Sequence, residues 1–287
     1  MTAAAAVLLA SLAAAPSGGA QDKPPTPRAG NVRVAYEDPK DPAHRPIQQR
    51  MRDRKVLERF ADVIGTVKLP YMLTLAFAGC DESNAWYDPD EHKVTFCYNM
   101  VADFEKAADG AAKYGISRED AVDGPTVFVF LHETGHALFS LLQVPVLGRE
   151  EDAADNVAAY ILLRAGPDIA RRVLAGAAWM YKHDASSRSA DESDFSDVHG
   201  LDVQRYYNVL CMAYGSDPKK FEGAMSKGGL PKDRAEGCEE EFAQVRYAVR
   251  KLISPSLDPK AVESFRKKRA QRQQAAPVQV SSPPPKP

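Results

Sequence analysis

The sequence lacks two features that would place it in other classes of protein. It has no uninterrupted apolar run of the roughly 18 residues that a membrane-spanning helix needs, so we expect no membrane span once the N-terminal segment is removed. It also lacks an excess of basic residues, because 37 lysines and arginines are balanced by 39 aspartates and glutamates. A nucleic-acid-binding domain normally carries a basic stripe, and we therefore expect no nucleic-acid partner.

Lysine and arginine are absent from the first twenty residues, a segment otherwise typical of a signal peptide. Residues 3–15 are almost entirely Ala, Val and Leu, and small residues follow up to Ala20. We expect cleavage after Ala20 and a secreted or periplasmic protein. An Ala-rich leader without a targeting role is the alternative. No cysteine lies near Ala20, which argues against a lipoprotein anchor.

Cysteine is also scarce, with four in 287 residues. Four cysteines allow three pairings. The two local pairs, Cys80 with Cys97 and Cys211 with Cys238, close the shortest loops. In an exported protein we expect both pairs to be disulfides. The alternative is four reduced, buried thiols that behave as small hydrophobic groups.

The composition divides the chain into four parts. Residues 1–20 are the predicted signal peptide, and residues 21–46 are rich in proline and charge, which is typical of an extended N-terminal arm. Residues 47–265 are long enough to form one folded domain with a sizeable core. Residues 266–287 begin with a basic run and end in prolines, which predicts a disordered tail.

Hydrophobic spacing and turn residues predict an α+β fold, with a small mixed or antiparallel sheet near the N-terminus followed by a mainly helical domain. Strands are expected at residues 69–77 and 93–98. A helix that contains residues 132–136 should begin near Pro125, since proline fits the first helical turn, and run to about Gln143. Further helices are expected at residues 48–66, 101–114, 150–164, 168–185, 201–214, 217–226 and 233–253, with a polar loop at 186–199.

The motif His132-Glu133-Thr134-Gly135-His136 carries the clearest chemistry in the sequence. Two histidines four residues apart project from one face of a helix, and two imidazoles at that spacing can bind one Zn²⁺. Glu133 is offset around the helix and can act as the general base on a metal-bound water. Apolar residues flank the motif, so it should be buried, where unpaired polar groups are costly. The alternative is a pair of core histidines satisfied by hydrogen bonds.

A third metal ligand should come from the acidic segment at residues 150–155. Glu151 and Asp155 are four residues apart and share a helix face. Glu151 can therefore bind the metal while Asp155 orients a ligand histidine from behind. Glu150 is the alternative ligand. An acidic first helical turn, favoured by the helix dipole, would explain two of the acids without any metal.

The sequence His132–His136 followed by Glu151–Asp155 resembles the motif pair of the gluzincin metallopeptidases, which include thermolysin. The resemblance implies a zincin-like domain in which the two histidines and Glu151 bind one Zn²⁺ per chain. It also implies that Glu133 is catalytic and that Asp155 supports a ligand histidine. Further segments, among them residues 84–87 and 204–208, resemble a bacterial family of proposed metallopeptidases whose function is otherwise unknown.

The segment Asn84-Ala85-Trp86-Tyr87 carries a second resemblance. Gluzincins often have an Asn-Ala-aromatic segment on the edge strand of their sheet. The resemblance implies that Asn84 and Ala85 bind substrate, because an edge strand can hold the backbone of an extended peptide. The alternative is a simple hairpin turn in which Asn84 is a turn former.

His199 is a further candidate for catalysis. Zinc peptidases need a donor for the developing oxyanion, commonly His or Tyr, and the two motif helices supply none. His199 follows the polar loop, so the chain can return to the cleft there. The rivals on the following helix are Arg205, Tyr206 and Tyr207. A residue at the start of a helix with no catalytic role is the alternative.

Together these features predict an exported zinc-dependent peptidase. We favour an endopeptidase that acts on peptide or protein substrates. The alternative is a non-catalytic zincin-fold zinc protein that binds a peptide or protein partner. The base at Glu133 argues against this alternative, because a purely structural zinc site has no use for one.

Overall fold

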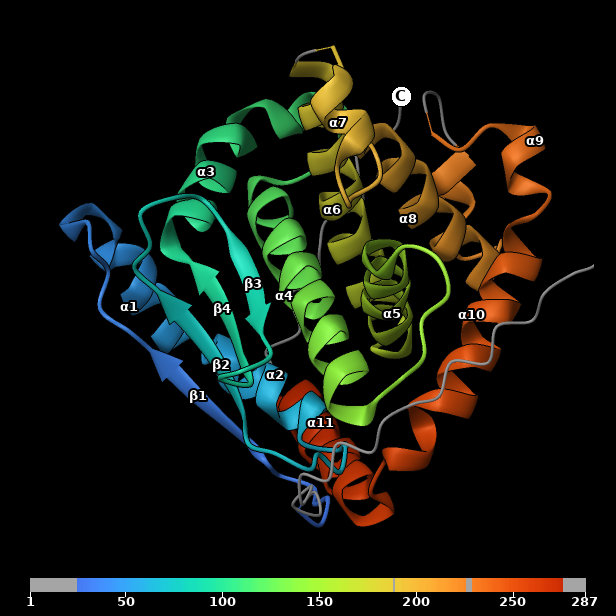
Figure 1. Cartoon of the computed structure of the whole chain (residues 1–287). Coiled ribbons are helices and arrows are strands. Elements are labelled where there is room, and N and C mark those ends of the chain that lie inside the picture. Colours follow the sequence, from blue (N-terminus) through green and yellow to red (C-terminus); the bar gives the residue numbers. More distant parts are fainter. Residues whose placement is uncertain (1–24, 188, 226–228, 276–287) are drawn as a thin grey trace, which may run out of the picture.

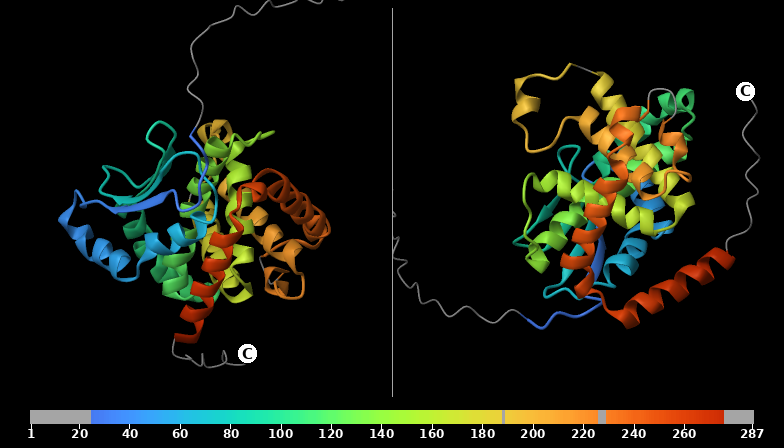
Figure 2. Two further views of the ribbon diagram at one scale, coloured as in Figure 1. Left: turned by 90° about the horizontal axis from the view of Figure 1, so that it is seen from below. Right: turned by 90° about the vertical axis from the view of Figure 1, so that its right-hand side faces the viewer.

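The computed structural model describes residues 25–187, 189–225 and 229–275. Strands lie near the N-terminus of this part and helices make up most of the rest, which confirms the predicted α+β class. The sheet and most of the later helices lie on opposite sides of a long central helix, α4 (Arg118–Leu142) (Figures 1 and 2). Every helix within the described ranges is too short or too polar to span a bilayer.

The sheet has four strands in the order β1-β2-β4-β3 and is mixed. The strands are β1 (Val32–Tyr36), β2 (Leu73–Ala78), β3 (Ala85–Asp88) and β4 (Lys93–Cys97). β1 and β4 each pair with β2 in parallel, whereas β3 pairs with β4 antiparallel. All of β2 is buried, as expected of a central strand that is covered on both faces. β3 comes last in the strand order and is therefore an edge strand.

Helices connect and cover the sheet. Between β1 and β2 the chain forms α1 (Arg45–Asp53) and α2 (Val56–Ile64). The helices that follow β4, besides α4, are α3 (Tyr98–Ala107), α5 (Glu150–Arg164), α6 (Pro167–Ser187), α7 (Glu192–Ser196), α8 (Asp202–Ser216), α9 (Lys232–Ala235), α10 (Cys238–Leu252) and α11 (Pro259–Ala275). α4 packs against α3, α5 and α6 and against strands β3 and β4.

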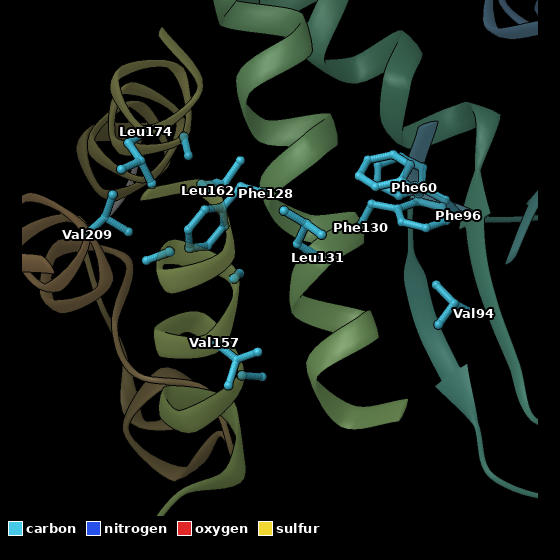
Figure 3. Close-up of a cluster of buried hydrophobic side chains, with 14 of the residues drawn as sticks. Phe60, Val94, Phe96, Phe128, Phe130, Leu131, Val157, Leu162, Leu174 and Val209 are labelled. Atoms are coloured by element: carbon cyan, nitrogen blue, oxygen red, sulfur yellow. The ribbon is translucent and has the colours of Figure 1, made fainter. Parts of the chain in front are cut away.

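Two hydrophobic layers bury α4 (Figure 3). On the sheet side, Phe130 packs against Phe60 of α2 and Phe96 of β4, with ring centroids 4.3 and 6.2 Å apart. On the other side, the ring of Phe128 packs edge-on against that of Tyr181 of α6, with ring centroids 6.1 Å apart. Apolar groups fill both layers at close packing, so a shift of α4 would open cavities on one side and clashes on the other. The middle of α4 is therefore a rigid support for polar side chains.

α4 begins at Arg118 rather than near Pro125, so the predicted start of this helix was wrong. Ser117 caps the helix, because its side chain accepts a backbone hydrogen bond from the first turn. Gly124, which suggests a turn in the sequence, instead lets α4 and α6 cross closely. A Cβ on Gly124 would lie 2.7 Å from the Cα of Gly176.

The predicted N-terminal arm also needs correction. The sequence predicts an extended arm at residues 21–46, but residues 32–36 form β1 and belong to the sheet. Val32 and Val34 pack against the hydrophobic core, and Arg33 donates a hydrogen bond to the hydroxyl of Thr74 on β2. The proline-rich composition around β1 hides this short strand. Residues 1–20, the predicted signal peptide, lie outside the described residues.

The predicted disordered tail is helical up to Ala275, because α11 continues through its first ten residues. Lys268 and Arg272 of α11 form ion pairs with Asp62 of α2. Arg269 donates a hydrogen bond to the backbone oxygen of Ala165. The basic run is thus partly used to hold α11 against the domain. Residues 276–287 lie outside the described residues, and the boundaries of the four parts remain predictions.

Smaller differences concern helix lengths. The predicted helix at 48–66 is divided into α1 and α2 where Lys55 has a positive φ of 51°. The predicted helix at 217–226 is reduced to a 3-10 turn at Glu222–Met225, and the polar loop at 186–199 contains the short α7. The predicted helix at 233–253 is divided into α9 and α10. The predicted helices at 48–66 and 233–253 are thus each divided by a local break.

Both predicted cysteine pairs are disulfides in the structure. Cys80–Cys97 joins the segment after β2 to the end of β4, and Cys211–Cys238 joins α8 to the first residue of α10. The four cysteines are therefore all paired. The first disulfide lies next to the edge strand β3, and the second joins the C-terminal half of α8 to the start of α10.

Candidate metal centre

The two sequence motifs meet because α4 and α5 pack against each other. His132 and His136 lie one turn apart near the middle of α4, and Glu151 lies in the first turn of α5. These three residues place a possible ligand atom each within 4.8 Å of one another. His132 is almost fully buried, whereas the other two are partly exposed at the cleft.

The spacing of the donor atoms fits a metal ion. Nε2 of His132 lies 2.9 Å, and Nε2 of His136 3.3 Å, from Oε2 of Glu151. The two Nε2 atoms are 3.2 Å apart. Two nitrogens bound at about 2.0–2.1 Å to a tetrahedral ion stand about 3.3 Å apart. Two imidazoles and one carboxylate at these distances could hold a divalent ion after only small side-chain shifts.

The electrostatics of this cluster keep its carboxylate ionised. Burial raises the pKa of Glu151, but hydrogen bonds with His132, His136 and His199 lower it by more, so the net shift is strongly downward. Burial lowers the pKa of His136, but Glu151 and Glu150 raise it to about 9. A metal ion binds neutral imidazole, so its binding would release protons from the cluster.

Asp155 lies behind His132, as the helix spacing predicts. Its Oδ1 is 2.7 Å from Nδ1 of His132, and Arg205 of α8 donates two further hydrogen bonds to the same carboxylate, each of 2.8 Å. An Nδ1–H that donates to Asp155 leaves Nε2 of His132 with its lone pair toward the cluster. The Arg205 guanidinium also lies 4.5 Å above the ring of Tyr181.

Glu150, the alternative ligand, lies outside the cluster. Its Oε1 is 2.8 Å from Nδ1 of His136, and its side chain is half exposed. Glu150 therefore stands behind His136 much as Asp155 stands behind His132. The first turns of α5 therefore supply one carboxylate, Glu151, to the donor cluster. Two more carboxylates of α5, Glu150 and Asp155, lie against the Nδ1 atoms of the histidines.

Glu133 lies beside the cluster and lines a cleft of about 400 Å³. Glu133 is only 9% exposed to solvent. Burial raises the pKa of Glu133, which makes its carboxylate a stronger base. A buried carboxylate that faces a cleft beside a possible metal site is placed to exchange protons with a molecule bound there.

His199 turns toward the cluster and lines the same cleft. Its Nε2 lies 3.0 Å from Oε2 of Glu151, and its Nδ1 lies 2.8 Å from Oδ1 of Asp197. The backbone N–H of His199 also donates to Asp197. Of the three rivals, Tyr206 and Tyr207 do not line the cleft, and Arg205 is held by Asp155.

Asn84 and Ala85 lie where β3 begins, at the edge of the sheet, and line the cleft. The side chain of Asn84 accepts a hydrogen bond from the backbone N–H of Ala85, and its backbone oxygen accepts one from Cys97 on β4. Ala85 therefore belongs to the edge strand, and Asn84 belongs to the turn that leads into this strand. Tyr87, further along β3, donates to Ser140 of α4 and fixes this edge against the motif helix.

The sequence does not reveal two parts of this site. One is the pairing of Arg205 with Asp155, which joins helices 50 residues apart along the chain. The other is the cleft wall supplied by α3 and α6, including Met100, Met180 and Asp184. Both arise from long-range packing, and the only local signal is the apolar spacing of the helices that carry them.

Comparison with known proteins agrees with this site. A family model described as "Putative metallopeptidase" matches residues 36–253, more than half of the chain. The match contains both motif helices, the edge strand and Arg205. Comparison with curated proteins gives no match, and neither does comparison with solved structures.

Proposed function

The chain belongs to this metallopeptidase family, and from that premise we propose that it is an exported, zinc-dependent peptidase of the gluzincin type. The observation that carries the proposal is the cluster of His132, His136 and Glu151 beside the buried carboxylate of Glu133. A structural zinc site usually closes with four protein ligands and needs no base. Here three donors meet at the wall of a cleft, and a base stands next to them.

Zinc is the metal that this donor set favours. Two imidazoles and one carboxylate are the ligands of the catalytic zinc in several peptidases. When bound, Zn²⁺ would polarise the scissile carbonyl and lower the pKa of a water molecule. Asp155 and Glu150 would hold the two histidines with Nδ1 protonated, so that each Nε2 faces the ion.

Glu133 moves the proton in the proposed reaction. Its carboxylate would take a proton from the attacking water and give it to the leaving nitrogen of the cleaved peptide. The raised pKa of Glu133 suits both steps, because the same group must accept and then donate. His199, oriented by Asp197, would donate a hydrogen bond to the oxyanion that develops on the scissile carbonyl.

The edge strand suits an extended peptide substrate. Asn84 and Ala85 begin the outer strand of the sheet and line the cleft beside Glu133. A peptide that adds to such an edge is held through its backbone, so chain ends are not required for binding. We therefore propose endopeptidase action, with Asn84 and Ala85 as substrate-binding residues.

Export is supported by the two disulfides. Disulfides form and persist in oxidising compartments and are rare in the cytosol. Cys80–Cys97 and Cys211–Cys238 use every cysteine of the chain. With residues 1–20 as a cleaved signal peptide, we propose a secreted or periplasmic location.

The experiment that tests the proposal combines metal analysis with a peptide-library cleavage assay on purified residues 21–287. We expect one Zn²⁺ per chain, loss of zinc in His132→Ala and His136→Ala, and cleavage of library peptides. Glu133→Gln should keep zinc and the fold but lose hydrolysis. Stoichiometric zinc in the double histidine variant would refute the site. Zinc binding without any cleavage would favour a non-catalytic zincin-fold protein that binds a peptide or protein partner.

The two acids at the start of α5 give a sharper test of the ligand set. Glu151→Ala should weaken zinc binding far more than Glu150→Ala, because only Glu151 belongs to the donor cluster. Glu150→Ala should weaken zinc by at most about 10–100-fold, the usual effect of losing a group behind a ligand. Equal losses would contradict the assignment of Glu151.

A further inference from the structure

The cleft beside Glu133 has an apolar part between α3 and α6. Its apolar lining comes from one face of α3, from α4 and from α6, and consists of Met100, Phe104, Ala107, Val129 and Met180. Val129 and Glu133 are four residues apart on α4 and therefore share a helix face. This apolar part, which we call the α3–α6 pocket, thus begins one helical turn from the proposed base.

Trp179 of α6 adds a polar atom to the lining of this pocket. Trp179 is 5% exposed and lines the cleft, but its indole Nε1 has no hydrogen-bond partner in the described part of the chain. The ring of His183 stacks on the indole, with ring centroids 5.4 Å apart, and so restricts its orientation. Buried polar groups are nearly always hydrogen-bonded in folded proteins. An N–H donor without a partner here indicates that a bound molecule supplies the acceptor.

The walls around Trp179 can adapt to such a molecule. Met100 and Met180 are unbranched side chains with three rotatable bonds, which fill irregular gaps and can change conformation at low cost. A side chain that entered between them would be covered by apolar atoms and would meet the indole N–H. The whole cleft measures about 400 Å³, which exceeds the volume of any single side chain.

We propose that the α3–α6 pocket is a specificity pocket for a tyrosine side chain next to the scissile bond. This inference rests on the proposed peptidase function. The tyrosine ring would lie between the apolar walls of α3 and α6, and its phenolic oxygen would accept a hydrogen bond from Nε1 of Trp179. His183 also lines the cleft, and a ring nitrogen of its neutral form can accept the bond that the tyrosine hydroxyl donates.

Other side chains satisfy only one half of the pocket. Phenylalanine or leucine would cover the apolar walls but leave the indole N–H without a partner, which is costly in a buried site. The head of lysine or arginine has no acceptor for the indole N–H. Glutamine would accept that bond but would bring two further N–H donors into apolar surroundings. Glutamate would place a charge there, beside the carboxylate of Asp103 on the same wall of the cleft.

Cleavage of matched peptides tests the proposal. The probes have blocked ends and the sequence of the best library substrate, with tyrosine, phenylalanine or alanine placed first on one side of the scissile bond and then on the other. On the side that the pocket serves, we expect kcat/KM to fall by about three- to tenfold from tyrosine to phenylalanine, the value of one hydrogen bond. From phenylalanine to alanine it should fall by at least about tenfold more, because apolar contact is lost.

The two tryptophans of the chain supply a variant and its matched control. Trp179→Phe keeps an aromatic ring but removes the N–H, so it should abolish the preference for tyrosine over phenylalanine and keep that for phenylalanine over alanine. Trp86, which is 40% exposed on β3, does not line the cleft, and Trp86→Phe should keep the tyrosine preference. Equal cleavage of the tyrosine and phenylalanine peptides by the parent protein would overturn the pocket, and so would an unchanged preference in Trp179→Phe.

A binding measurement separates this inference from the peptidase proposal and leaves Trp179 in place. In a protein with Trp86→Phe and Glu133→Gln, Trp179 is the one remaining tryptophan, so tryptophan fluorescence reports on the pocket. The tyrosine peptide should bind more tightly than the phenylalanine peptide. It should also shift the emission to longer wavelengths, because a hydrogen bond to Nε1 stabilises the polar excited state of indole. This result supports the pocket even if no peptide is cleaved. Cleavage by the parent protein, combined with equal binding of both peptides or with an unchanged Trp179 emission, would overturn the pocket and leave the peptidase function intact.

Discussion

Gly135 of α4 and Ala154 of α5 are in direct contact: a Cβ built on Gly135 would lie 3.2 Å from the Cβ of Ala154 and 3.1 Å from its Cα. Gly135 directly precedes His136, and Ala154 lies between Glu151 and Asp155. The close approach of the two helices at this point therefore sets the distance between the histidines and the carboxylates that surround them.

Gly135→Ala should disturb the metal site more than the fold. The added methyl group has only the backbone and methyl of Ala154 to displace, so α4 and α5 must separate by a few tenths of an ångström. We expect a loss of stability of about 1–3 kcal/mol, typical of overpacking, and zinc binding weakened at least tenfold. Chelator competition and urea unfolding measure the two effects. Gly110→Ala is the control, because its Cβ would meet nothing within 4 Å, and equal zinc affinity in both variants would contradict the prediction.

Arg205→Gln should weaken metal binding indirectly, through Asp155 and His132. The substitution leaves Asp155 buried with His132 as its remaining partner. Breaking a buried ion pair from one side typically costs on the order of 3–5 kcal/mol, and we expect zinc affinity or activity to fall by about 10–100-fold. Arg171→Gln, which breaks an exposed pair with Asp168, should cost less than about 1 kcal/mol.

A double variant checks that reasoning. Asp155→Asn with Arg205→Gln removes both charges, so it should unfold at a higher urea concentration than Arg205→Gln alone. If the single and double variants unfold at the same midpoint, the lost stability does not come from the unpaired charge of Asp155.

The parts of the molecule that could be predicted are those with a local signal. β2 is one buried apolar run, and the helix at 150–164 was predicted with the bounds that α5 has. Glu151 could be chosen over Glu150 because the four-residue spacing to Asp155 places them on one helix face. The two disulfides followed from the shortest loops.

The parts that could not be predicted depend on contacts far apart in the sequence. Gly124 resembles a turn former until Gly176 is known to lie against it. Arg205 resembles a surface cation until Asp155 is known to lie 2.8 Å away. A single sequence records neither contact, because spacing along one helix says nothing about which other helix covers it.

Removal of the disulfide near the edge strand should destabilise the protein. Cys80 and Cys97 are 17 residues apart, and a cross-link over such a loop contributes about 3 kcal/mol, mainly by restricting the unfolded chain. Cys80→Ala with Cys97→Ala should therefore lower the free energy of unfolding by about that amount in urea titrations. Mass mapping without reductant should recover both cysteine pairs. Free thiols at all four positions would also contradict export.

Asp62 should make stability depend on pH at the acid end. Burial raises its pKa, but hydrogen bonds from Lys268 and Arg272 of α11 lower it by more, so the folded pKa lies below the unfolded value of about 3.9. A lowered carboxylate pKa contributes stability above the unfolded pKa, and that contribution disappears as the pH falls through the folded pKa. Since both cationic partners are about half exposed, the effect should stay below about 1 kcal/mol.

Asp62→Asn measures this contribution. The variant should be less stable than the parent by the same amount at pH 7 and pH 5, and the difference should shrink below pH 4. High salt should reduce it at neutral pH, because the pairs are partly exposed. A deficit that grows as the pH falls would contradict the pairing of α11 with α2.

His199→Ala should slow catalysis while leaving zinc in place. His199 faces the cleft, with Asp197 on one ring nitrogen and Glu151 near the other. It does not belong to the donor cluster of His132, His136 and Glu151, so metal analysis should still find one zinc per chain. The loss of one oxyanion donor typically costs on the order of 10²–10³ in kcat. Because the proposed hydrogen bond from His199 is made only in the transition state, its loss in His199→Ala should lower kcat and kcat/KM together.

Asp197 and Tyr206 separate the donor role from the alternatives. Asp197→Asn keeps a group beside the ring but removes its charge, so kcat should fall by less than it does in His199→Ala. Tyr206 is buried away from the cleft, and Tyr206→Phe should leave kcat nearly unchanged. A normal kcat in His199→Ala, with or without a higher KM, would contradict the donor role. Loss of zinc in His199→Ala would instead make His199 a ligand, because only a residue that contacts the ion should change the metal content.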